Sequence, residues 1–296
     1  MTSNQSAWVE LSSDELRVQI DPLGAQLSTL QDRTGHDLLW NGDAAIWSGR
    51  APWLFPIVGA LAGGRYRFDG KSYALPRHGF ARGKPFEVIE ADGRQAVFRL
   101  RADPGTLTVY PFQFELDVRF ELLSSTLKLT AQIRNLGPAA MPASFGFHPA
   151  FRWPLPTAGA RASHFIEFAV EESAPVRRLN AEGLVTPNRY PTPIRGRRLP
   201  LDDRLFMDDA LILDAVRSRS VRYGTEVGPQ IQVEFPRTPF LGLWSKPGAP
   251  FICIEPWHGV ADPEGFNGAL TEKPGIFSVG PGAVTEVQVQ IGLTTR

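Results

Sequence analysis

Short segments in which apolar and polar residues alternate with a period of two recur along much of the chain. Alternation of this kind places apolar side chains on one face of a β-strand and polar side chains on the other. The pattern therefore predicts many strands that each bury one face. The clearest examples are residues 15–20, 95–101, 112–120, 126–134, 230–235 and 286–291.

Helical periodicity is almost absent, and only short helices or turns are expected, near residues 43–47 and 202–206. The 28 Gly and 26 Pro residues are scattered as turn signals rather than gathered in a linker. Closely spaced strands without a regular strand–helix rhythm favour a large antiparallel sandwich. We therefore predict an all-β fold, with residues 1–296 in a single domain.

The composition is that of an ordinary globular protein, with 43% hydrophobic and 21% charged residues. Lys plus Arg equals Asp plus Glu, 31 each, so no net charge attracts nucleic acid or an acidic membrane. We expect no signal peptide, because residues 1–10 lack a basic start and an apolar run, and no apolar run approaches the roughly 20 residues of a membrane-spanning helix. These features predict a cytoplasmic protein with no nucleic-acid or membrane partner, taken to be a monomer or weak homodimer.

Two apolar segments lead to a titratable side chain that is followed by proline. Residues 251–254 precede Glu255-Pro256, and residues 144–147 precede His148-Pro149. We expect each strand to end at its proline. A buried charge costs several kcal/mol unless it has a partner or a function, and histidine titrates near neutral pH. The two segments therefore predict one proton-transfer site formed by distant parts of the chain.

Structural interpretations of the same residues remain open at this point. Glu255 could be a buried carboxylate paired with Arg237 or Arg82, and His148 could be a core histidine with one backbone hydrogen bond. Cys253, within the apolar run, is interpreted as a buried apolar side chain rather than a nucleophile.

A third segment, residues 75–83, combines His78 with Arg77, Arg82, an aromatic ring and two glycines. Guanidinium groups can bind neighbouring oxygens, and a ring can stack on the apolar face of a sugar. The segment is typical of a carbohydrate cleft, although a surface loop explains it equally well. The tryptophans fit the same cleft but could also be core residues, notably Trp53, Trp153, Trp244 and Trp257.

Other polar residues are given ordinary structural roles. His36 and His164 are interpreted as surface residues, and Asp262 as a turn-forming residue before proline. The motifs GxSxG, GK[ST], HExxH and CxxC are absent, and no histidine or carboxylate spacing indicates a metal. We therefore expect neither a metal nor an organic cofactor.

In this order, the segments resemble the aldose 1-epimerase (galactose mutarotase-like) family over nearly the whole chain. The family fold is a β-supersandwich of two large sheets. Residues 253–257 are most similar to the branch of uncharacterised aldose epimerase-like proteins. The resemblance is carried by residues 20–27, 55–59, 78–82, 147–151, 208–209 and 253–257.

The resemblance implies anomer interconversion by acid–base catalysis. Glu255 matches the general base that removes the proton of the anomeric hydroxyl, and His148 matches the general acid that protonates the ring oxygen. With unperturbed pKa values of about 4.3 and 6.5, Glu255 would be ionised at neutral pH and His148 would be able to donate a proton. His78 matches a second sugar contact, and one of Asp208 and Asp209, with Asp209 favoured, matches a hydroxyl-binding aspartate.

One departure from the family concerns sugar recognition. Many members carry an arginine directly after the early glycine, whereas Gly59 is followed by alanine here. Arg82, or else Arg65, is expected to replace it, with Trp257 as a further substrate contact. A free hexose such as glucose or galactose is the expected substrate.

Two alternatives to a free-hexose epimerase stay open. One is a hexose-6-phosphate 1-epimerase, since a phosphate site could be formed by Arg65, Arg67, Arg77 and Arg82. The other is a non-catalytic carbohydrate-binding protein that keeps the cleft.

Overall fold

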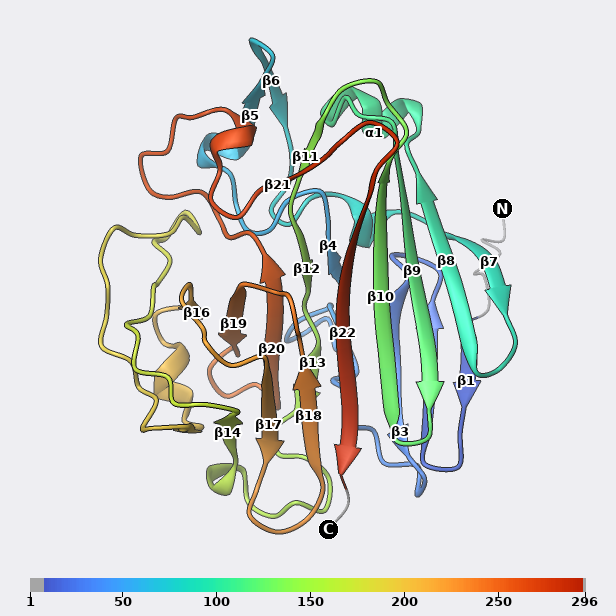
Figure 1. Ribbon diagram of the computed structural model, residues 1–296. Coiled ribbons are helices and arrows are strands. Elements are labelled where there is room, and N and C mark those ends of the chain that lie inside the picture. Colours follow the sequence, from blue (N-terminus) through green and yellow to red (C-terminus); the bar gives the residue numbers. More distant parts are fainter. Residues whose placement is uncertain (1–7, 295–296) are drawn as a thin grey trace.

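The computed structural model describes residues 8–294, which form five antiparallel sheets (Figure 1). The largest has nine strands, and its central members are long alternating segments of the sequence. In spatial order its strands are β15 (Arg198–Pro200), β14 (Phe165–Phe168), β17 (Ser220–Gly224), β18 (Gln230–Glu234), β22 (Val284–Thr294), β10 (Thr126–Asn135), β9 (Phe114–Leu123), β8 (Gln95–Arg101) and β7 (Glu87–Ala91).

A six-stranded sheet carries the candidate site. Its order is β16 (Leu211–Leu213), β19 (Phe240–Trp244), β20 (Phe251–His258), β12 (Phe145–Phe147) and β4 (Trp53–Leu54), with β13 (Ala150–Arg152) also paired to β20. The smaller sheets contain β1 (Val9–Ser12), β2 (Leu16–Asp21) and β3 (Gln26–Asp32), then β5 (Arg65–Phe68) with β6 (Lys71–Ala74), and β11 (Met141–Ala143) with β21 (Phe277–Val279).

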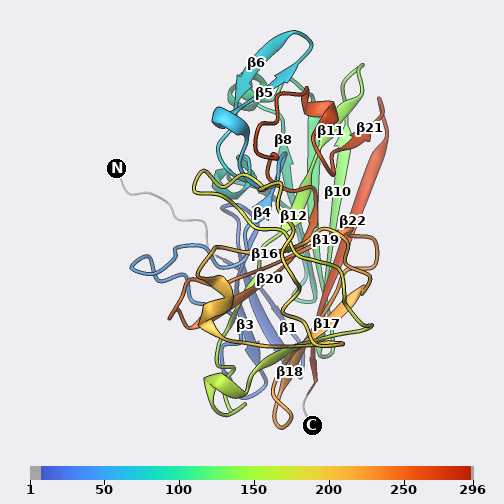
Figure 2. The same cartoon turned by 90° about the vertical axis from the view of Figure 1, so that its left-hand side faces the viewer.

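The sheets pack face to face around one large apolar cluster. In the side view, β22 and β10 run along the right, with β20 and β16 to their left (Figure 2). Trp53 joins the two layers, because its ring stacks on Phe147 of β12 and meets the edge of Phe120 of β9. The predicted all-β sandwich is therefore confirmed.

The helical elements are all short. A 3-10 turn at Asp203–Phe206 (η4) confirms one of the two predicted positions, and residues 44–46 form a turn at the other. The sequence did not predict α1 (Pro104–Val109), which Asp103 caps by accepting the Thr106 N–H. Four more 3-10 turns are η1 (Ala62–Gly64), η2 (Ala81–Gly83), η3 (Arg161–Ser163) and η5 (Leu270–Glu272).

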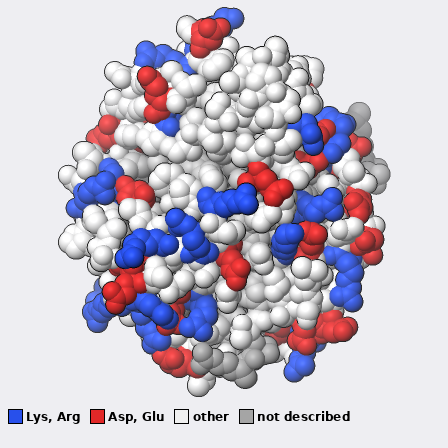
Figure 3. Space-filling model, viewed as in Figure 1, with Lys and Arg blue, Asp and Glu red and all other residues white. Residues whose placement is uncertain are grey.

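Charges of both signs are intermixed on the surface, although the upper centre of the face in Figure 3 carries few. Lys and Arg lie beside Asp and Glu over the face shown in Figure 3, with no region of a single sign. Some of these charges pair across neighbouring strands, such as Arg99 with Asp117 at 2.6 Å and Arg101 with Glu115 at 3.0 Å. None of the helices between residues 8 and 294 has the length and apolar character needed to cross a membrane.

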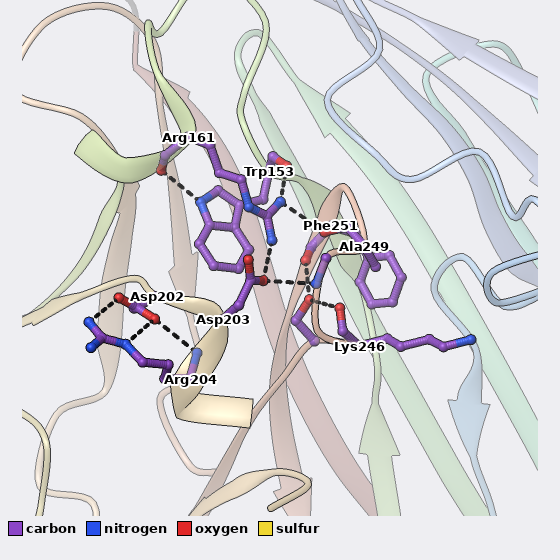
Figure 4. A network of polar contacts seen from close by, with 10 residues as sticks. Trp153, Arg161, Asp202, Asp203, Arg204, Lys246, Ala249 and Phe251 are labelled. Atoms are coloured by element: carbon purple, nitrogen blue, oxygen red, sulfur yellow. Dashed lines mark hydrogen bonds and ion pairs between the residues drawn. The ribbon is translucent and has the colours of Figure 1, made fainter. Parts of the chain in front are cut away.

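The loop between β19 and β20 is held by Arg161. Its guanidinium lies 3.5 Å from the Trp153 ring centroid and donates to the Ala249 carbonyl and the Asp203 carboxylate (Figure 4). Cation–π contacts and charge-assisted hydrogen bonds of this kind restrict a loop strongly. The start of β20 at Phe251 is thereby fixed.

β20 continues through Pro256 to His258, so the expectation that this strand ends at its proline is wrong. The Ile254 N–H points toward Pro149. Because alternate residues of a strand point the same way, the Pro256 nitrogen faces the same side, where the ladder is interrupted between β12 and β13. Proline is tolerated there because no ladder partner needs its missing N–H.

Candidate active site

His148 and Glu255 meet at the interruption between β12 and β13. Both short strands pair with β20, so His148 lies opposite the middle of β20, where Glu255 projects. His148 Nε2 is 3.1 Å from Glu255 Oε2, and their side chains are 10% and 2% exposed. No arginine among residues 8–294 forms an ion pair with Glu255, so its pairing with Arg237 or Arg82 as a structural carboxylate is excluded.

The pair lines a cavity of about 290 Å³, close to the lower limit of small-molecule sites. The structure brings the other predicted substrate-binding residues into the same cavity: His78, Arg82, Asp209 and Trp257. His148 Nδ1 and Trp257 Nε1 are buried without a hydrogen-bond partner in the described part of the chain, and Glu255 Oε2 has only its 3.1 Å contact with His148. Unpaired buried polar atoms are costly, so these atoms indicate a polar ligand.

Three aromatic rings hold the imidazole of His148. Trp47 stacks on it at 5.1 Å between ring centroids, whereas Trp244 at 5.9 Å and His78 at 5.8 Å present edges. The ring therefore has little freedom to rotate, and its Nε2 stays directed at Glu255.

Burial dominates the electrostatics of the pair. It lowers the pKa of His148 to about 3, a shift that nearby Arg82 and Arg77 increase. Burial also raises the pKa of Glu255 well above its usual range, with Arg77 opposing the rise. The expectation of unperturbed pKa values is therefore wrong. Burial therefore favours the uncharged forms of both groups, a carboxylic acid beside a neutral imidazole.

His78 has a defined tautomer. Its Nδ1 accepts the Gly59 N–H at 3.1 Å, so the proton of the neutral ring lies on Nε2. Burial, followed by the charges of His148 and the neighbouring arginines, lowers the pKa of His78 well below its usual range. Since the ring lines the cavity, it offers a ligand a fixed, uncharged donor.

Two glycines form the support on which Trp257 lies. A Cβ at Gly146 would come within 2.7 Å of the indole, and one at Gly242 within 2.3 Å. Real Cβ atoms are not found so close to other atoms, so any larger residue would displace the ring. Gly146 and Gly242 therefore let the indole lie flat across β12 and β19, facing the cavity.

Charged side chains of both signs line the cavity. Arg77 and Arg82 both line it, and neither forms an ion pair among the described residues. Asp209 lines it as well, whereas its neighbour Asp208 does not and is exposed. The backbone of Asp209 has a positive φ of 63°.

A model of the aldose 1-epimerase family matches residues 8–270. The chain belongs to the aldose 1-epimerase family. It is therefore an isomerase of the epimerase class.

Similar proteins share the fold over almost their full length. Protein LacX (chromosomal) of Lactococcus lactis subsp. lactis is 34% identical over 283 residues, which cover 92% of this chain and 95% of LacX. A galactose mutarotase related enzyme of Lactobacillus acidophilus superposes with a TM-score of 0.90 at 28% identity, covering 98% of both chains. A galactose mutarotase-like protein of Lactobacillus casei ATCC 334 superposes with a TM-score of 0.90 at 26% identity, and the match covers 97% of this epimerase and 100% of that chain.

Several sequence interpretations are corrected by the structure of the epimerase. Trp53 and Trp153 are core residues that do not line the cavity, whereas Trp244 does. Arg65 lines a second cavity instead, so Arg82 remains as the candidate sugar contact. His164 is buried rather than on the surface, and its Nε2 accepts the Leu155 N–H.

Trp47 was not singled out from the sequence. It comes from the irregular segment between β3 and β4, where Trp40 Nε1 donates to its carbonyl at 2.8 Å. No periodicity marks this segment, so only the composition offered a signal.

One group of potential metal ligands occurs within residues 8–294: His148, Cys253 and Glu255 have ligand atoms within 4.8 Å of one another. Cys253 is fully buried and does not line the cavity. Burial raises the pKa of its thiol well above the usual range. Because metals bind the thiolate, this protonated thiol is a poor ligand.

Proposed function

We propose that this epimerase interconverts the α and β anomers of a free hexose, with Glu255 and His148 as its acid–base pair. The observation that carries the proposal is their 3.1 Å contact on the wall of an aromatic-lined cavity. A sugar with C1 at the pair would place its anomeric hydroxyl and ring oxygen, which are bonded to one carbon, against these two groups.

The reaction begins with the single proton of the pair. Burial favours the neutral form, but an anomeric hydroxyl that donates to Glu255 stabilises its carboxylate, and a ring oxygen accepts from protonated His148. Glu255 takes the O1 proton, the C1–O5 bond breaks, and His148 delivers its proton to O5. The product is the open-chain aldehyde.

Ring closure repeats these steps in reverse on the other face of the carbonyl. After rotation about C1–C2, the O5 hydroxyl attacks C1 and returns its proton to His148, while Glu255 protonates O1. The pair ends in its starting state, so no cofactor is consumed. Each well-placed acid or base contributes about 10²–10⁴ to such a rate.

The remaining cavity residues would orient the ring. His78 offers its Nε2–H to a hydroxyl, Arg82 donates and Asp209 accepts from others, and the indole of Trp257 covers an apolar sugar face. These contacts are charge-assisted or desolvated, which favours one pose of the substrate.

A second candidate is a hexose 6-phosphate. It is favoured by Arg77 and Arg82, two guanidinium groups at the cavity without a carboxylate partner among the described residues. Phosphate binds such pairs in a bidentate manner. Arg65 and Arg67 lie at a different cavity and do not add to this site.

The test is exchange spectroscopy by NMR, which measures the rate of anomer interconversion at equilibrium. Glucose, galactose and glucose 6-phosphate should be compared at equal concentration, with the spontaneous rate subtracted. We expect the free hexoses to be interconverted with the larger kcat/KM. A preference above tenfold for the phosphate ester would overturn the choice of substrate, and sugar binding without exchange would indicate a binding protein.

A further inference from the structure

A buried ion pair lines the second cavity, and its Asp262 directly follows Ala261, which lines the candidate active site. Lys273 Nζ is 2.6 Å from Asp262 Oδ1, with side-chain exposures of 0% and 3%. The sequence indicated only a turn residue at Asp262. Lys273 follows η5, which lies beside β5 near the top of Figure 1. A buried ion pair contributes little net stability, so stability alone does not explain why a charged pair is buried here.

All polar groups of Asp262 are used to join neighbouring segments. Its Oδ2 accepts the Ala62 N–H at 2.9 Å, and its own N–H donates to the Ala60 carbonyl at 2.9 Å. Its carbonyl accepts the Val185 N–H at 2.9 Å. Asp262 thus fixes both ends of residues 60–62, and Lys273 supplies the counter-charge that a buried carboxylate requires.

The segment held by Asp262 begins next to the residue that orders His78. Gly59 N–H donates to His78 Nδ1 at 3.1 Å, and His78 N–H donates back to the Gly59 carbonyl at 2.9 Å. Ala261 supports Gly59 from behind, since a Cβ on Gly59 would lie 2.4 Å from the Ala261 Cα. These contacts connect Asp262, through residues 59–62, to the hydrogen bond that sets the His78 tautomer.

We propose that Asp262 is a positioning residue, with Lys273 as its counter-ion, which acts through residues 59–62 to keep the His78 Nε2–H directed at the substrate. The carboxylate contact with Ala62 is the essential link. This inference rests on the proposed function only for the identity of the acceptor, a sugar hydroxyl.

Two double variants separate positioning from simple stability. Asp262→Asn with Lys273→Met removes both charges but retains a side-chain oxygen for the Ala62 N–H. Asp262→Ala with Lys273→Met removes both charges and that oxygen. Neither leaves an unpaired buried charge, so both are expected to fold. Each serves as the matched control of the other.

The first readout is the nitrogen NMR spectrum of the His78 ring, assigned with His78→Asn. The asparagine double variant should keep the single Nε2–H tautomer, and the alanine double variant should show a mixture. This readout needs no turnover, so it remains valid if the proposed function fails.

The second readout is KM in the anomer-exchange assay. Loss of one well-directed hydrogen bond predicts a KM about tenfold higher for the alanine double variant than for the asparagine one, with a smaller change in kcat. The difference should vanish in a His78→Asn background, which a purely structural effect would not produce. The proposal is overturned if the two double variants share the same tautomer or the same KM.

Discussion

The pH dependence of the epimerase should reflect the buried environment of His148 rather than the ordinary titration of an imidazole. The active form of the pair carries one proton, and acid inactivates it by adding a second. With a His148 pKa of about 3, about 1% of the imidazole would be protonated at pH 5. An unperturbed imidazole would be about 97% protonated at that pH.

The assay is kcat/KM for anomer exchange between pH 4 and 8, which reports the titration of the free enzyme. We expect no loss of activity with a midpoint near 6.5, and a decline only below about pH 4. Far-UV circular dichroism must show that the protein stays folded over the range, and His36→Asn, at an exposed histidine outside the cavity, is the control. An acid limb centred near 6.5 would refute the assigned burial effect.

Two further substitutions test the geometry of the cavity. Gly242→Ala places a Cβ 2.3 Å from the Trp257 indole. Overpacking of this kind costs about 1–3 kcal/mol, and the displaced indole should raise KM. The control is Gly280→Ala, whose Cβ has no contact closer than 3.9 Å and which should leave KM unchanged. An unchanged KM in Gly242→Ala would remove the indole from sugar binding. Asp209→Asn should raise KM severalfold and Asp208→Asn should leave it unchanged, and the opposite order would show that the wrong aspartate was chosen.

The strands were predictable because each long alternating segment buries one face. Residues 95–101 coincide with β8, and residues 126–134 differ from β10 by a single residue. The helix α1 was missed although its signal was present, since Asp103 and Pro104 form a standard capped start. The single-domain organisation stays a prediction.

The site was predictable in its residue types but not in its electrostatics. His148 and Glu255 stood out because each follows an apolar run, and family resemblance supplied their roles, which also stay predictions. Their pKa shifts depend on burial, which for His148 comes in part from Trp47 and Trp244, and Trp47 comes from an irregular segment. The buried pair of Asp262 and Lys273 likewise depends on tertiary packing, which one sequence does not reveal.

The most direct test of the acid–base pair is anomer exchange by Glu255→Gln and His148→Asn, each compared with the wild type on the same sugar. Glu255→Gln keeps the size of the side chain, whereas the asparagine of His148→Asn is smaller than the imidazole it replaces. We predict that each lowers kcat by about 10²–10⁴ with little change in KM, because the contacts act mainly in the transition state. Wild-type kcat in either variant would contradict the account.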